Sequence, residues 1–124
     1  MGKIRTHKDL DVYQLSFEAG MQIFYISKNF PKEEKYSLTD QIRRLSRSVS
    51  GNIAEAWRHR RYPKSFISKL STSEGEAAET QVWLDYALAC EYIKGEIHKE
   101  LYSKYDNVIG KLVNMIRNPE KWSI

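Results

Sequence analysis

Apolar residues recur every three or four positions along most of this chain, which is the spacing that places them on one face of an α-helix. The stripe from Leu38 to Asn52 alternates steps of four and three residues, as bundle helices do. The stripe from Ile97 to Met115 steps by four, four, three, four and three residues. No segment shows the alternation of a convincing strand, so the pattern predicts an all-α protein.

Proline residues mark the ends of the predicted helices. Phe30-Pro31 ends the first, because the residue before a proline avoids the helical conformation, and Asn118-Pro119 ends the last. Pro63 suits the first turn of the third helix. The predicted helices span residues 9–29, 38–58, 63–92 and 96–117. Short connections make consecutive helices antiparallel, so we predict one domain over residues 1–124, an up-down-up-down antiparallel four-helix bundle.

The first predicted helix carries two apolar stripes. We expect the first stripe to face the core; it comprises Tyr13, Phe17, Gly20, Met21 and Phe24. The second stripe and the late third helix then hold more apolar surface than a soluble monomer exposes, which predicts a closed, symmetric homo-oligomer. The candidate interface residues are Val12, Leu15, Ala19, Ile23, Ile26, Val82, Trp83 and Tyr86. The alternative is that the first helix is central and is wrapped by its neighbours.

Charge is distributed unevenly along the 124 residues, although the net charge is only +4. The segment 43–69 holds eight cations and one anion, whereas the segment 71–107 holds eight anions and three cations. This polarity indicates either a polyanionic partner or the self-association of opposite faces. With 41% hydrophobic residues, the chain can bury a core of its own.

Arginines form the strongest functional signal. Arg43, Arg47 and Arg58 lie within about 60° of one another on a helical projection, opposite the core stripe. Guanidinium groups match phosphate oxygens, and nearby aromatic rings can stack on bases. The candidate nucleic-acid-binding residues are Arg43, Arg44, Arg47, Arg58, Arg60 and Arg61, with Trp57 and Tyr62 as stacking groups. The alternatives are a solvated face without function, or a face paired with the acidic third helix of a neighbouring subunit.

A polar set lies at the edge of the core stripes. It comprises Gln41, Asn52, Glu55, Glu76 and Glu79. We expect these residues to form a hydrogen-bond layer that fixes helix register, with Arg44 paired to Glu55 or to a carboxylate of the third helix. A catalytic carboxylate pair is the alternative.

Little in the sequence favours catalysis. A di-metal bundle site needs Glu-x-x-His twice, but His98 follows Glu96 by two positions and His59 follows Glu55 by four. Cys90 is the only cysteine, so it forms neither an internal disulfide nor a cysteine-based zinc site. We therefore predict no enzyme, no cofactor and no metal. The absence of a signal-peptide pattern or a long apolar run predicts a cytoplasmic protein without a membrane partner.

Four short sequence motifs occur together in this chain. They are DLDVYQ at 9–14, FPKEEKYSL at 30–38, QIRRLSRSV at 41–49 and NIAE at 52–55. Together with Glu79-Thr80-Gln81 and Tyr92-Ile93, they resemble the four-helix-bundle proteins encoded in intervening sequences of bacterial large-subunit ribosomal RNA genes, often labelled S23 ribosomal proteins. The resemblance covers about residues 8–117 and departs from the family at Ala56 and at 73–76.

The resemblance extends to function. Family members are similar to the accessory variability protein of diversity-generating retroelements, a basic pentameric barrel that binds nucleic acid and a reverse transcriptase. The resemblance therefore implies a homopentamer with a nucleic-acid role. We predict a non-enzymatic, oligomeric accessory protein that binds RNA or DNA. The alternative is a protein-interaction scaffold whose basic and acidic faces pair between subunits or with a partner protein.

Overall fold

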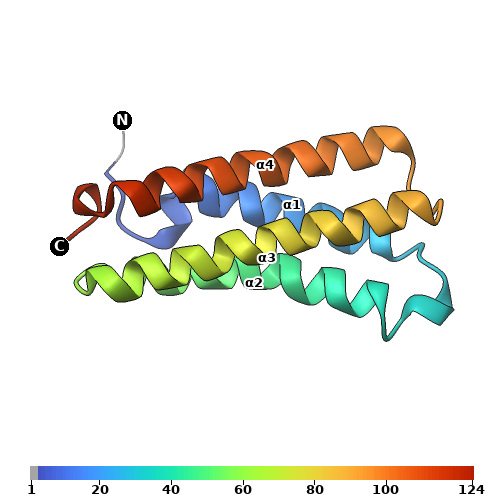
Figure 1. Cartoon of the computed structure of the whole chain (residues 1–124), viewed down its shortest axis with the longest axis horizontal. Helices are drawn as coiled ribbons and strands as arrows, with labels where there is room; N and C mark the ends of the chain where they lie inside the picture. The colour runs from blue at the N-terminus through green and yellow to red at the C-terminus, as the bar shows by residue number, and fades with distance from the viewer. Residues whose placement is uncertain (1–2) are drawn as a thin grey trace.

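The computed structural model describes residues 3–124, and these form a bundle of four long helices. The helices are α1 (Asp11–Ser27), α2 (Leu38–Arg58), α3 (Pro63–Ala89) and α4 (Gly95–Arg117), with short 3-10 helices η1 (His7–Asp9), η2 (Lys32–Glu34) and η3 (Pro119–Lys121). Figure 1 shows that consecutive helices run in opposite directions, which confirms the predicted all-α four-helix bundle. The first two residues of the predicted domain lie outside the described range.

The observed helix ends follow from local backbone chemistry. α2 has the predicted bounds, whereas α3 ends at Ala89, earlier than predicted. Glu91 adopts a left-handed backbone conformation with φ 64°, and the Tyr92 N–H donates to the Ala87 carbonyl at 2.8 Å. This geometry is a Schellman motif, which stops a helix. At the other end of the molecule, the Thr6 side chain caps η1, and Leu10 is then extended with ψ 129°, so α1 begins at Asp11.

The core stripes of α2, α3 and α4 pack as their periodicity predicts. Ile42, Val49 and Ile53 of α2 are fully buried, as are Leu101 and Tyr105 of α4. α3 contributes further buried side chains, which are Phe66, Leu70, Ala77 and Leu84. Within residues 3–124, no helix has an apolar stretch long enough to cross a bilayer.

α1 corrects the prediction of which stripe faces the core. Val12, Ala19 and Ile23, predicted at an interface between copies, are buried in the core of the chain itself. Phe17 and Met21, predicted in the core, are 53% and 37% exposed. The remaining candidates on this helix, Leu15 and Ile26, are partly buried against the core. The alternative, in which neighbouring helices cover this stripe, is therefore correct for its three buried members.

Small side chains explain why α1 turns this way. The buried stripe of α1 includes Ser16, whose hydroxyl lies 3.0 Å from the Ser50 hydroxyl of α2. At Gly20, an added Cβ atom would already lie 3.7 Å from the Ser46 carbonyl oxygen. The two helices approach closely through these small residues, and the bulky aromatic stripe is left outside. Apolar periodicity could not show this, because it counts buried serines as polar positions.

Candidate nucleic-acid interface

Arg43 and Arg47 of α2 lie beside the aromatic stripe of α1. The Arg43 Nε atom donates a hydrogen bond to the Ser27 hydroxyl at 2.7 Å. The guanidinium carbons of Arg43 and Arg47 lie 5.1 Å and 5.9 Å from the centre of the Phe24 ring. Neither arginine forms an ion pair with a carboxylate within the described part of the chain, so their positive charge is not neutralised locally.

A lysine extends this positive region across α1. Lys28 Nζ lies 4.8 Å from the centre of the Phe24 ring, the ring that Arg43 also contacts. The sequence did not predict Lys28 as part of this region, because Lys28 lies outside the basic segment 43–69. The signal that could have found it is the spacing of Phe24 and Lys28, which are four residues apart and therefore share a helix face.

The far end of α2 carries the remaining cations. Arg58 is exposed on α2, and Arg61 is exposed in the turn that follows, because the helix ends before it. We call Arg43, Arg47 and Arg58 the arginine row; Arg61 does not join it, because α2 ends at Arg58. The row extends over about 22 Å at 1.5 Å per residue. No member of the row pairs with a carboxylate among residues 3–124.

Trp57 is not available as a stacking group, which corrects the sequence prediction. Its side chain is only 4% exposed. The Arg60 guanidinium lies 3.4 Å from the centre of the Trp57 ring, and Arg60 Nε donates to the Trp57 carbonyl at 2.8 Å. Burial lowers the pKa of Arg60 below its ordinary value. Arg60 therefore covers Trp57 rather than facing a ligand, whereas Tyr62 remains well exposed.

Arg44 also differs from its predicted arrangement. It pairs with Asp40, one turn earlier on α2, at 3.4 Å, and not with Glu55 or a carboxylate of α3. Both side chains are largely exposed, and such surface pairs contribute about 0–1 kcal/mol. Because Arg44 has a carboxylate partner, it is a weaker candidate than the arginine row.

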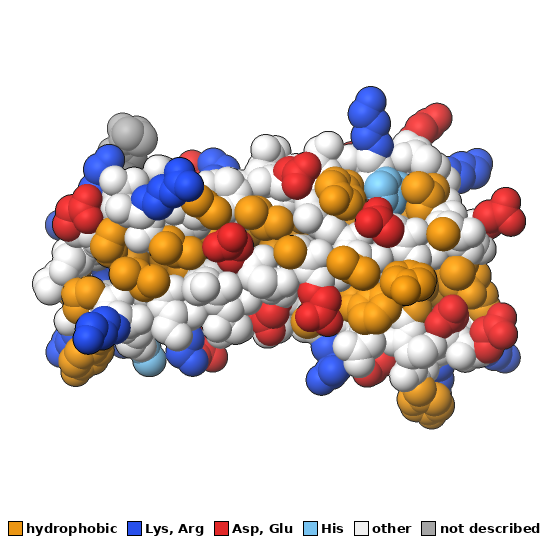
Figure 2. All heavy atoms as spheres, viewed as in Figure 1, with side chains coloured by type: hydrophobic (Ala, Val, Ile, Leu, Met, Phe, Trp, Pro, Cys, Tyr) orange, Lys and Arg blue, Asp and Glu red, His pale blue; other side chains and the backbone are white. Residues whose placement is uncertain are grey.

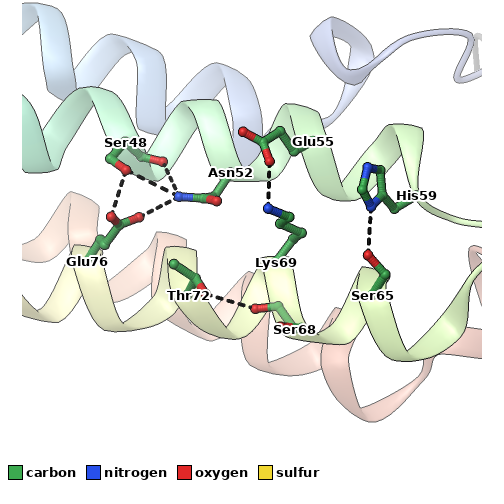
Figure 3. Close-up of polar contacts among 9 residues, drawn as sticks. All are labelled: Ser48, Asn52, Glu55, His59, Ser65, Ser68, Lys69, Thr72 and Glu76. Carbon is green, nitrogen blue, oxygen red and sulfur yellow. Dashed lines mark hydrogen bonds and ion pairs between the residues drawn. The ribbon is translucent and has the colours of Figure 1, made fainter.

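Polar side chains link α2 to α3 on another side of the molecule (Figure 3). Ser48 and Asn52 donate to the two carboxylate oxygens of Glu76 at 2.6 Å and 2.7 Å. Lys69 Nζ lies 2.8 Å from Glu55, and this hydrogen bond lowers the pKa of the Glu55 carboxyl. The expected hydrogen-bond layer is thus confirmed for Asn52 and Glu76. The two glutamates have separate partners, and no hydrogen bond joins them.

The other members of the predicted polar set stand apart from this layer. Gln41 lines a small hollow at the start of α2, and Glu79 is exposed on α3; neither forms a side-chain hydrogen bond among residues 3–124. Within the same range, no three His, Cys, Asp or Glu residues gather in a way that could hold a metal ion.

An aromatic groove lies between α1 and α2, next to the arginine row. It encloses about 390 Å³. Its lining residues are Tyr13, Phe17, Gly20, Met21, Phe24, Ser46, Arg47, Ser50, Gly51 and Ala54. The Tyr13 and Phe17 rings are stacked, with centroids 6.1 Å apart and planes 25° apart. We call this feature the α1–α2 groove. Sequence reasoning missed it because it placed these aromatic residues in the core.

The face formed by α3 and α4 has a different character. Figure 2 shows acidic side chains across this face and a cluster of apolar side chains toward the C-terminal end of α3. Two of the predicted interface residues, Val82 and Tyr86, are 46% and 56% exposed there. The Trp83 ring lies 5.6 Å from that of Tyr86. We call Val82, Trp83 and Tyr86 the α3 patch.

Comparison with known proteins identifies the family. The family model described as "23S rRNA-intervening sequence protein" matches residues 8–114. The chain belongs to this family. A similar solved structure is a protein from the S23 ribosomal protein family of Bacteroides thetaiotaomicron VPI-5482, with a TM-score of 0.77 and 29% sequence identity. The match covers 86% of this chain and 95% of that chain.

Membership of the 23S rRNA-intervening sequence protein family confirms the resemblance seen in the sequence. The model match includes residues 41–55, which contain the start and middle of the arginine-bearing helix. The Bacteroides protein is described as having unknown function, and neither description names a reaction. No curated protein matches the chain.

Proposed function

We propose that this 23S rRNA-intervening sequence protein is a non-enzymatic, oligomeric accessory protein that binds RNA or DNA through the arginine row. One observation carries the proposal: the row lies along α2 without carboxylate partners among residues 3–124. Cations that are not neutralised within the chain attract a polyanion strongly, because binding releases the counterions condensed on its phosphates. The similarity of the family to the basic retroelement accessory protein supports the same function.

The chemistry of the row favours contact with phosphates over recognition of sequence. The guanidinium group of arginine forms paired hydrogen bonds with phosphate oxygens. Such contacts position a nucleic acid without selecting bases. Arg43 is held in place by Ser27 and Phe24, so little side-chain entropy is lost when it binds. Binding should therefore depend weakly on sequence and strongly on salt.

Replacing two arginines tests the proposal. We expect Arg47→Ala with Arg58→Ala to weaken binding of a fluorescent RNA or DNA oligonucleotide by at least about tenfold at about 50 mM salt. The matched control is Lys99→Ala with Arg117→Ala, which removes the same charge from exposed positions of α4. Anisotropy titrations measure both. Equal losses in the two variants, or no binding by the unmodified protein, would contradict the proposal.

We further propose that copies associate through the α3 patch. Much of the α1 stripe predicted at an interface is in the core, whereas Val82 and Tyr86 remain outside. A cluster of exposed apolar side chains beside acidic ones is typical of a contact surface. The family resemblance favours a closed ring of five copies, in which the α3 patch of one copy contacts a different surface of the next.

A charge placed in the α3 patch tests this association. We expect Tyr86→Asp to reduce the particle mass measured by light scattering, because an isolated carboxylate is costly to bury. Ser71→Asp, at an exposed position nearer the start of α3, should leave the mass unchanged. A particle that has the mass of one chain before any substitution would overturn the association.

A protein-interaction scaffold is the second candidate function. The observation that favours it is the acidic α3–α4 face, whose exposed Glu79 has no hydrogen-bonding partner among the described residues and lies on the same helix as the α3 patch. In this case Arg47 of one copy would pair with Glu79 of the next and would not be available to phosphate. Charge exchange distinguishes the two functions: Arg47→Glu with Glu79→Arg restores the mass lost in Arg47→Glu alone only if the scaffold is correct.

A further inference from the structure

The α1–α2 groove is a hollow whose shape results from unequal side chains. α1 supplies large flat groups, of which Phe17 is 53% exposed. The facing positions of α2 are small, and Gly51 has open space where a Cβ atom would lie. The groove encloses about 390 Å³, at the small end of the range for pockets that hold ligand groups.

The two serine hydroxyls of the groove already have hydrogen-bond partners. The Ser46 hydroxyl already donates to the Arg43 carbonyl at 3.1 Å, and the Ser50 hydroxyl is paired with Ser16. Apart from the Tyr13 hydroxyl and the Arg47 guanidinium, the surfaces left for a ligand are ring faces and aliphatic atoms. A flat apolar group fits such walls, because aromatic rings stack favourably in offset arrangements.

The charged residues around the groove indicate that its ligand also carries negative charges. Arg47 is the one charged residue among the lining residues, and no carboxylate lines the groove. Arg43 and Lys28 add further cations at Phe24. A partner that offers flat rings joined by negative charges is complementary to this combination. Single-stranded nucleic acid has this chemistry, since every base has an aromatic face next to a phosphate.

We propose that the α1–α2 groove receives unpaired bases of single-stranded RNA or DNA, whose phosphates lie on the arginine row. This inference rests on the proposed function and narrows its ligand to unpaired strands. Bases stack on Tyr13 and Phe17, and the backbone follows α2 past Arg47. Duplex bases are paired and stacked in the helix interior, so a duplex meets only the arginines.

A second copy of the chain is a poorer occupant of the groove. A helix with its side chains is about 10–12 Å across, which is wide for a hollow of about 390 Å³. Such a contact would also bury Arg47, and a buried charge is costly unless the other copy places a carboxylate at that point.

Two substitutions test the groove while leaving the arginine row intact. Phe17→Ala removes an exposed ring, and Gly51→Leu fills the groove from a position where the added side chain meets nothing within 4 Å of its Cβ. The matched control is Gly75→Leu, an exposed glycine of α3 with the same open space. Dissociation constants are measured for a single-stranded oligonucleotide and for its duplex at one salt concentration. Circular dichroism confirms that each variant is folded.

We expect Phe17→Ala and Gly51→Leu each to weaken single-strand binding by about tenfold and to leave duplex binding unchanged. The Gly75→Leu control should bind both as the unmodified protein does. If both groove variants bind single strands normally while Arg47→Ala with Arg58→Ala does not, the groove inference is overturned and the proposed function stands. If no nucleic acid binds the unmodified protein, both fall. If the groove variants change only the particle mass, the groove holds a second copy and the inference is overturned.

Discussion

Buried hydroxyl groups in the core differ in whether they form hydrogen bonds. Tyr105 is fully buried, and its hydroxyl has no hydrogen-bond partner among residues 3–124. Burial alone raises the pKa of this phenol well above its ordinary value. By contrast, the buried hydroxyls of Ser16, Ser73 and Thr80 all have partners. The Tyr105 hydroxyl is therefore a cost to stability and not a source of it.

Removing that hydroxyl should stabilise the protein. Because an unsatisfied buried polar group costs about 1–3 kcal/mol, we expect Tyr105→Phe to raise the free energy of unfolding by about 1 kcal/mol. Urea denaturation followed by circular dichroism measures the change. The comparison variant is Tyr92→Phe, whose hydroxyl donates to Glu34 at 2.8 Å and which should not gain stability. A loss of stability in Tyr105→Phe would mean that the hydroxyl has a partner in solution.

Single residues also limited what could be predicted of the site. The sequence identified the arginine row because charge and helical spacing suffice to place exposed cations on one face. It failed for Trp57, because nothing in the sequence indicates that Arg60 folds back over the ring. The distinction between an exposed and a covered aromatic residue depends on contacts that form only in the folded chain.

Helices were predictable where one apolar stripe was dominant. α4 has a single stripe, and its buried residues match it; α2 buries most of its stripe and, in addition, Ser46, Ser50 and Trp57. α1 has apolar residues on two sides, and small residues such as Ser16 and Gly20 decided which side packs closely. Periodicity cannot rank two such stripes, since the choice depends on how closely the neighbouring helix approaches. The α1–α2 groove was missed for the same reason.

The end of α3 offers a prediction at the level of the element. Glu91 occupies the left-handed position of the Schellman motif, where glycine pays no steric penalty. We expect Glu91→Gly to raise the free energy of unfolding by about 1 kcal/mol in urea titrations. Glu91→Ala is the control, because it removes the charge but keeps the Cβ atom. An equal gain in both variants would show that the charge, and not the backbone, is responsible.

At the scale of the whole molecule, the two proposed contact surfaces lie on different sides of the bundle. The arginine row and the α1–α2 groove lie on the side where α1 meets α2, and the acidic α3–α4 face carries the α3 patch. In the proposed function, the first side meets phosphates and the α3–α4 face meets a second copy of the chain. The charge count along the sequence already indicated two faces, but only the bundle shows which helices carry each face together.

The salt dependence of nucleic-acid binding measures how many phosphates the arginine row contacts. Binding constants for a single-stranded oligonucleotide are measured over a series of salt concentrations, for the unmodified protein and for Arg47→Ala with Arg58→Ala. About three phosphate contacts per chain predict a slope of about −2 in log K against log salt concentration, and the variant should lose most of that slope. Salt-independent binding, or the same slope in both proteins, would contradict the account.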